Sequence, residues 1–275
     1  MKAAVQADAT TGLPAPGEPL LSVDGITLRF GGVQALAGVE FTIYAGEICA
    51  IIGPNGAGKT SMLNVLNGAY QPTEGTITFK GRTRRKMRPR VAAMEGMART
   101  FQNVALFKGM STLDNVMAGR NLKMHSNFVA CLLPAGPSRT EEARHRAAAD
   151  EVIGFLEIED IRNVPVGRLP YGLQKRVELA RALAAEPDLL LLDEPMAGMN
   201  RGEKAEMSRF ILETKARFGT TMALIEHDMS VVMELSDHIV VLDYGRKIAD
   251  GTPEEVRNDQ AVIDAYLGVA TEDDE

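Results

Sequence analysis

The chain has no tryptophan, few cysteines and no long hydrophobic run. A membrane-spanning helix needs about 20 consecutive apolar residues, and the longest candidates, such as residues 128–133, are far shorter. We therefore expect no segment that crosses a membrane. A strong positive charge is also lacking, since the net charge is −7 and the pI is near 5.3. Proteins that bind nucleic acid by bulk electrostatic attraction are usually basic, so we expect no nucleic-acid partner.

The 2 cysteines, Cys49 and Cys131, lie far apart in apolar stretches, without a histidine or a second cysteine nearby in the sequence. This pattern predicts buried, reduced thiols in a cytosolic protein and implies no metal site. Three histidines, His125, His145 and His238, have no catalytic context and are interpreted as structural or solvated.

The most informative stretch runs from residue 47 to residue 66. The apolar run Ile48–Ile52 predicts a buried strand, and the next eight residues, GPNGAGKT, fit the phosphate-binding pattern G-x-x-x-x-G-K-[ST]. Apolar residues at helical spacing follow, so the motif has the strand and the helix that it requires. The candidate nucleotide-binding residues of this stretch are Gly53, Pro54, Asn55, Gly56, Ala57, Gly58, Lys59, Thr60 and Ser61.

Phosphate geometry explains these residue types. Glycines allow backbone angles that turn successive N–H groups inward, and the start of the following helix adds the positive end of its dipole. Lys59 can reach the β- and γ-phosphates, and the Thr60 hydroxyl can ligate Mg²⁺. The alternative is a glycine-rich turn that binds nothing.

Two further polar groups follow predicted buried strands. Residues 189–192 are apolar and end in Asp193 and Glu194, where Asp193 can hold Mg²⁺ and Glu194 can orient or deprotonate a water. The strand at 221–225 leads to His227, which could donate a hydrogen bond to the γ-phosphate. The alternatives are a structural turn for the acidic pair and a satisfied structural residue for the histidine.

Other segments allow coarser predictions. Residues 1–19, rich in Ala, Pro and Gly, lack the apolar core of a signal peptide and predict a disordered leader. The strand predicted at 20–30 ends at Phe30, which either stacks on a purine or is an ordinary packing residue. The basic run at 80–90 either meets lipid head groups or an acidic partner, or is a solvated face.

Helices are predicted between residues 111 and 163 and within residues 169–185. The inward face of the first is assigned to Ala143, Ala147, Val152, Phe155 and Leu156, and that of the second to Val177, Leu179, Ala180 and Leu183. Short strands are predicted at residues 39–43, 75–80, 238–242 and 247–249.

Taken together, these motifs resemble those of the ATP-binding subunit of ABC transporters over nearly the whole chain. The phosphate loop, Gln102, the segment 169–174, the Asp193–Glu194 pair and His227 follow one another in that family's order. The wording FGGVQAL, RTFQN, LPYGLQKRVELARAL, DEPMAGMN, IEHDM and GTPEEVRNDQAVIDAYLG resembles the ATPase of bacterial branched-chain (hydrophobic) amino acid uptake systems.

The resemblance implies the α/β fold of P-loop NTPases, with a RecA-like core, an antiparallel β subdomain and an inserted helical subdomain at about 104–178 that faces the membrane partner. The ATPase domain would span residues 20–268, before an acidic tail at 269–275. ATP and Mg²⁺ are the implied cofactors, with ATP held between two such subunits. Phe30 would stack on adenine, and Gln102 would sense the metal and the attacking water.

The implied roles can be grouped by chemistry. The implied catalytic residues are Glu194, His227 and Gln102; the implied metal site comprises Thr60, Gln102 and Asp193; and Tyr171, Gly172 and Gln174 of the signature segment add to the nucleotide site.

Two positions depart from the family pattern. Pro170 stands where the signature segment usually has a serine that reaches the opposite γ-phosphate, and Asn200 replaces an aspartate. Both departures concern contacts across a dimer, whereas the residues that act within one chain are intact. This asymmetry predicts a heterodimer with a second ABC ATPase, although a homodimer stays open.

The implied function is ATP hydrolysis that powers branched-chain amino acid uptake through separate integral membrane permease subunits. The chain would lie peripherally on the cytoplasmic face of a bacterial inner membrane and would cooperate indirectly with a solute-binding protein. The alternatives are the same role in a urea or amide importer or a lipid exporter, and a soluble nucleotide-gated clamp. A small-molecule kinase would need neither the signature segment nor His227.

Overall fold

The computed structural model describes residues 13–123 and 137–267. The predictions made for residues 1–12, His125, 128–133, Cys131 and the acidic tail lie outside these described residues.

A six-stranded sheet forms the centre of the molecule, in the order β10-β9-β3-β8-β7-β6. The strands from β9 to β6 pair in parallel, and β10 pairs antiparallel with β9. Every residue of β3, β7 and β8 is buried, as their largely apolar sequences predict. The carboxyl ends of these strands therefore share one edge. The strand bounds are β3 Ile48–Ile52, β6 Met97–Arg99, β7 Leu189–Asp193, β8 Thr221–Ile225, β9 His238–Asp243 and β10 Arg246–Gly251.

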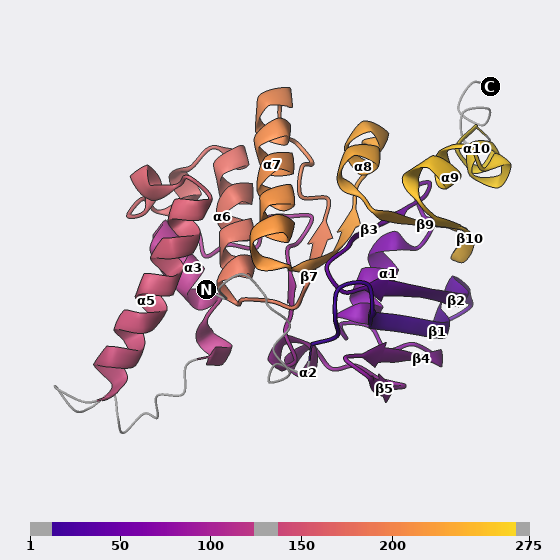
Figure 1. The fold of residues 1–275 in the computed structure, drawn as a ribbon, viewed down its shortest axis with the longest axis horizontal. Helices are drawn as coiled ribbons and strands as arrows, with labels where there is room; N and C mark the ends of the chain where they lie inside the picture. The colour runs from indigo at the N-terminus through magenta and orange to yellow at the C-terminus, as the bar shows by residue number, and fades with distance from the viewer. Residues whose placement is uncertain (1–12, 124–136, 268–275) are drawn as a thin grey trace.

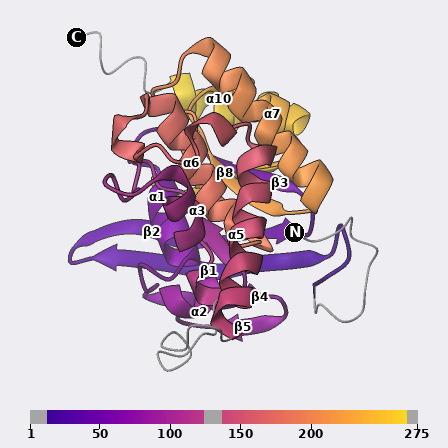
Figure 2. The same cartoon turned by 90° about the vertical axis from the view of Figure 1, so that its left-hand side faces the viewer.

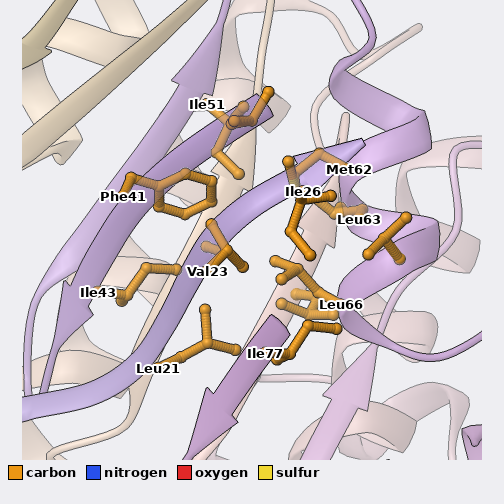
Figure 3. Packing of buried hydrophobic residues seen from close by; sticks show 14 of the residues in the cluster. Leu21, Val23, Ile26, Phe41, Ile43, Ile51, Met62, Leu63, Leu66 and Ile77 are labelled. Atoms are coloured by element: carbon orange, nitrogen blue, oxygen red, sulfur yellow. The ribbon is translucent and has the colours of Figure 1, made fainter. Parts of the chain in front are cut away.

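A second sheet is antiparallel and has the order β2-β1-β4-β5. Its strands are β1 Pro19–Phe30, β2 Val33–Tyr44, β4 Glu74–Phe79 and β5 Arg82–Arg84. Figure 3 shows side chains of this sheet, such as Val23 and Ile77, beside Ile51 of the central sheet and Leu66 of α1 (Lys59–Leu66). Helix α1 is thus packed into the core that both sheets share, which fixes the loop in front of it.

The remaining helices cover the central sheet and form a lobe beside it. Helices α3, α5 and α6 pack against one another in that lobe, at the left of Figure 1 and facing the viewer in Figure 2. The helices are α2 Pro89–Met94, α3 Thr112–Ala118, α5 Pro137–Phe155, α6 Tyr171–Ala184, α7 Arg201–Phe218, α8 Met229–Leu235, α9 Pro253–Arg257 and α10 Gln260–Leu267, with short 3-10 turns at Asn121–Lys123, Glu159–Ile161 and Val166–Arg168. None of the helices in the described ranges combines the length and the apolar character needed to cross a bilayer.

The predicted fold class is confirmed, but the predicted inward face of α5 was partly wrong. Ala143 and Ala147 are exposed, whereas His145 and Ala149 are buried together with Val152. The buried face of α5 also carries Ile153 and Leu156. His145 belongs to this face although it is polar, and its ring accepts a hydrogen bond from the buried Arg120 guanidinium (Nε to Nδ1, 2.8 Å). A partner on a neighbouring segment is not visible in the apolar spacing of the sequence.

Candidate nucleotide site

The predicted phosphate loop connects β3 to α1. Gly53 (φ 146°) and Gly58 (φ 100°) have backbone angles that favour glycine. A Cβ at Gly53 would also lie 1.9 Å from the Leu242 carbonyl oxygen. Gly58 caps α1 without any side-chain hydrogen bond, so the first amides of the helix are left to a ligand. The backbone is therefore suited to an anion.

Lys59 is buried and turns back onto its own loop. Its Nζ donates to the carbonyl oxygens of Gly53 (2.7 Å) and Pro54 (2.8 Å). Burial lowers the pKa of Lys59, while the negative charge of Glu194 acts in the opposite direction. The ammonium thus lies where the motif requires it, held by two acceptors that a phosphate can replace.

Asp193 is the last residue of β7 and is almost fully buried. Its Oδ2 pairs with Arg99 Nη2 at 2.7 Å, and Arg99 Nη1 also donates to Asn64 Oδ1 of α1 at 2.6 Å. Among the described residues Asp193 Oδ1 has no hydrogen-bond partner, although it is buried. A buried carboxylate oxygen left free in this way fits a cation ligand, so Asp193, with the exposed Thr60 hydroxyl, suits Mg²⁺.

Glu194 is held between two of the predicted catalytic side chains. Gln102 Nε2 donates to Oε2 at 2.9 Å, and His227 Nε2 lies 2.6 Å from Oε1. The Glu194 carboxylate is largely buried, whereas Gln102 and His227 are exposed. The three predicted catalytic residues therefore converge from separate segments at one carboxylate, next to Asp193.

The signature-segment residues lie elsewhere, at the start of α6. Gln174 Nε2 donates to the Leu169 carbonyl oxygen (2.8 Å), and Gly172 leaves room for Glu203, whose Oε1 would lie 2.2 Å from an added Cβ. Tyr171 is 42% exposed. In the part of the chain that the structure describes, no hydrogen bond joins Tyr171, Gly172 or Gln174 to the phosphate loop. Their role at the nucleotide site stays a prediction.

The other predicted contacts are local. Phe30, at the end of β1, is 47% exposed and meets Tyr70 edge-on, with ring centroids 5.1 Å apart, so its ring is accessible for stacking. Asn200 caps α7, accepting from the amides of Gly202 (2.9 Å) and Glu203 (3.1 Å). Pro170 precedes α6, where the structure shows no side-chain cap.

Sequence reasoning missed several polar residues that support the site. Arg99 holds Asp193, and Glu226 accepts hydrogen bonds from the amides of Met196 (2.9 Å) and His227 (3.3 Å). Burial raises the pKa of Glu226. Both lie within two or three residues of the predicted Gln102 and His227, which was the only available signal.

The prediction that Cys49 has no histidine nearby was wrong, because the fold brings His238 next to it. Donor atoms of Glu47, Cys49 and His238 lie within 4.8 Å of one another. His238 is held by two carboxylates, through Asp250 Oδ1 (2.5 Å from Nε2) and Glu47 Oε1 (3.2 Å from Nδ1). The hydrogen bond with Asp250, followed by those with Cys49 and Glu47, raises the pKa of His238 to about 12. The two carboxylates beside the imidazole ring thus favour its charged form.

Comparison with known proteins identifies two family models. One, described as ABC transporter, matches residues 36–197, and the other, described as branched-chain amino acid ATP-binding cassette transporter, matches residues 246–272.

Curated relatives match nearly end to end. The high-affinity branched-chain amino acid transport ATP-binding protein BraF of Pseudomonas aeruginosa is 40% identical over 252 residues, which cover 92% of this chain and 99% of the relative. LivG of Escherichia coli strain K12, which carries the same description, is 42% identical over 256 residues, with the same coverage of 92% and 99%. Among solved structures, the ADP conformation of an ATP-binding cassette of an ABC transporter has a TM-score of 0.79 at 30% identity, covering 91% of this chain and 99% of that one.

Proposed function

The chain belongs to the ABC transporter ATP-binding family, and we propose that it hydrolyses ATP to power the uptake of branched-chain amino acids. The observation that carries the hydrolytic part is the Glu194 carboxylate, held by Gln102 and His227 beside Asp193. The match of residues 246–272 to the branched-chain amino acid transporter model supports the choice of solute.

The chain's own residues suggest how hydrolysis proceeds. The phosphates of ATP enter the loop before α1, where Lys59 exchanges its two carbonyl acceptors for phosphate oxygens. Glu194 orients a water in line with the γ-phosphate and accepts its proton. The exposed His227, whose Nε2 contacts Glu194 Oε1, exchanges that contact for a hydrogen bond to the phosphate oxygens that gain charge. Mg²⁺, when bound to Asp193 and Thr60, would stabilise that charge.

Transport requires subunits that this chain does not supply. We place the chain on the cytoplasmic face of a bacterial inner membrane, beside separate permease subunits, because its relatives include bacterial transport ATP-binding proteins. A second ATPase subunit completes each nucleotide site, since Tyr171, Gly172 and Gln174 make no described hydrogen bond to the phosphate loop of their own chain. A solute-binding protein would deliver the amino acid from the other side.

The test is uptake of labelled leucine in cells that lack this chain, with urea and glutamate as comparison solutes. We expect leucine uptake to be lost selectively, to return with the wild-type gene, and to stay absent with Lys59→Ala, because that variant loses the phosphate-binding ammonium. Unchanged leucine uptake, in a strain without other leucine importers, would contradict the proposed solute. A urea defect instead would favour the alternative importer.

A further inference from the structure

Lys175 is a buried lysine on the second turn of α6, outside every predicted site. Its side chain is 3% exposed, and its Nζ donates to three backbone carbonyl oxygens, of Gln102 (2.8 Å), Phe101 (3.2 Å) and Glu194 (3.3 Å). Two of these carbonyls belong to the catalytic residues Gln102 and Glu194. An ammonium has three N–H donors on one compact charge, which matches the number of its acceptors here.

A second buried residue of α6 also binds the loop around Gln102, residues 101–105. Glu178, 1% exposed and one turn further along α6, accepts hydrogen bonds from the amides of Ala105 (3.1 Å) and Phe101 (3.4 Å). The loop from 101 to 105 is therefore attached to α6 through its carbonyls by a cation and through its amides by an anion. If α6 moves, this loop is expected to move with it.

Glu194 needs such support. It is a non-glycine residue with φ 48°, in the left-handed region that side chains disfavour. Backbone strain of this kind persists where the surroundings hold it in place. Lys175 bonds the carbonyl of this residue, and the Glu194 amide donates to the Ile225 carbonyl oxygen at 3.0 Å. The direction of the general base thus depends on α6 as well as on β8.

We propose that Lys175 is a positioning residue that couples the signature end of α6 to hydrolysis in its own chain. The inference rests on the proposed function, in which the start of α6 meets the nucleotide bound by a second subunit. Nucleotide there would fix α6, and Lys175 would then hold Glu194 and Gln102 in the arrangement that orients the attacking water. One chain's site would respond in this way to the occupancy of the other.

The test compares purified, assembled transporter carrying Lys175→Met, Lys175→Arg or Arg176→Met. Misplacing a catalytic group by about 1 Å can cost about 100-fold in rate, so we expect Lys175→Met to lower kcat about 100-fold while the KM for ATP changes less than about threefold. Lys175→Arg keeps the positive charge and several N–H donors. We therefore expect its kcat to be at least about tenfold higher than that of Lys175→Met.

Arg176→Met is the matched control, because Arg176 is the next residue on α6 but pairs with Glu206 and lies over the Phe210 ring. We expect it to lower the melting temperature and to leave kcat within about twofold of wild type. An equal loss of kcat in this control would overturn the proposal, since general damage to α6 would then explain both variants.

The dependence of rate on ATP concentration gives a second readout. We expect the wild-type transporter to respond cooperatively to ATP, and Lys175→Met to lose that cooperativity, because its two sites are no longer coupled. A kcat within threefold of wild type for Lys175→Met would overturn the inference. If that variant does not fold, Lys175→Gln, which keeps one amide donor group, is judged by the same threshold. Glu194→Gln separates this inference from the assignment of the base: loss of hydrolysis in Glu194→Gln with full activity in Lys175→Met overturns the inference alone, whereas hydrolysis that survives Glu194→Gln shows that another group acts as the base. Absence of hydrolysis in the wild-type transporter would contradict the proposed function itself.

Discussion

Glu194 combines three properties that a general base needs: burial, fixed orientation and a neighbouring cation site. Gln102 and His227 each contact one oxygen of the carboxylate, and these two contacts restrict rotation of the carboxylate group. The adjacent Asp193 is tied to α1 through Arg99 and Asn64. The base and the predicted metal ligand are therefore positioned by different partners, although they are consecutive in the sequence.

This arrangement predicts the effect of Glu194→Gln. The substitution keeps the size of the side chain and removes its basicity, and general bases contribute about 10²–10⁴-fold to rates. We expect ATP hydrolysis to fall by at least about 100-fold, while ATP affinity stays within about threefold because Lys59 and the loop are unchanged. Steady-state phosphate release and equilibrium nucleotide binding would measure the two effects.

The matched control for that variant is Glu206→Gln, an exposed carboxylate of α7 whose described partner is Arg176. It should hydrolyse ATP at the wild-type rate. Robust hydrolysis by Glu194→Gln would show that another group acts as the base.

The sequence allowed the prediction of individual catalytic residues but not of the contacts between them. Glu194, His227 and Gln102 are predicted as catalytic because each stands in a recognisable motif, and their convergence follows from the shared edge of the parallel sheet. Arg99 and Lys175 were missed because their partners, Asp193 and the carbonyl of Glu194, lie 94 and 19 residues away. Nothing in local spacing indicates such pairs.

Helix α6 begins without the side-chain cap that most helices use. Pro170 occupies the N-cap position, with φ −53° and ψ 152°. Its carbonyl oxygen accepts from the Gln174 amide at 3.0 Å, but its ring has no side-chain acceptor for the first amides of the helix. A serine there would offer its hydroxyl to those amides, and it would also restore the group that the family's signature segment carries. The same substitution should therefore change both stability and turnover.

For Pro170→Ser we expect the melting temperature to rise by about 2–4 °C, since an N-cap contributes about 1 kcal/mol. We also expect faster ATP turnover by the assembled transporter, because a hydroxyl becomes available to the partner's γ-phosphate. Differential scanning calorimetry and phosphate release are the measurements. Pro170→Ala, which adds neither a cap nor a hydroxyl, is the control, and unchanged or slower turnover of the serine variant would contradict the hypothesis about the dimer.

Helix α7 shows that some elements were missed although their signals were present. Asn200 and Glu203 form a capping box at its start, and Gly219 ends it in a left-handed conformation (φ 61°). Met207, Phe210, Ile211 and Thr214 provide the buried stripe at helical spacing. Asn200, predicted only as a departure from a dimer contact, is thus also the N-cap of α7.

The His238 cluster links neighbouring strands of the central sheet, on the side where β3 and β9 begin. Glu47 precedes β3 and Asp250 lies in β10, so the charged imidazole links two neighbouring parts of the central sheet. Because its pKa in the folded protein, about 12, lies above the ordinary value, the folded state binds a proton that the unfolded state releases. The stabilisation is fully present below pH of about 6.5 and is lost as the pH rises toward 12.

We therefore expect the wild-type protein to lose stability between pH 6.5 and pH 9 more steeply than His238→Gln does. One proton contributes at most about 1.4 kcal/mol per pH unit. Denaturant midpoints at several pH values would measure the slope. His238→Arg, which stays charged throughout, should keep the stability and lose the slope; identical slopes in all three proteins would show that His238 carries no excess proton.

At the level of the whole chain, the sequence was sufficient to predict the α/β class and the family. It also showed the order in which the motifs follow the strands of the central sheet. Of the antiparallel sheet, β1 and β4 were predicted, and β2 only for residues 39–43. Strands β5 and β6, with three residues each, are too short to show a period. The Cys49–His238 contact was unpredictable, because it depends on β3 and β9 being neighbours.

The position of Lys59 has a consequence for selectivity. The Lys59 ammonium already donates hydrogen bonds to the carbonyl oxygens of Gly53 and Pro54. These two carbonyls therefore compete with any ligand for the ammonium. A ligand that binds Lys59 must therefore replace these two hydrogen bonds. Its affinity depends on how much more strongly the ammonium interacts with the ligand than with two neutral carbonyl oxygens. A polyphosphate wins this exchange because its oxygens carry full charge. A neutral ligand gains nothing from it, and the loop thereby rejects such ligands without any further side chain.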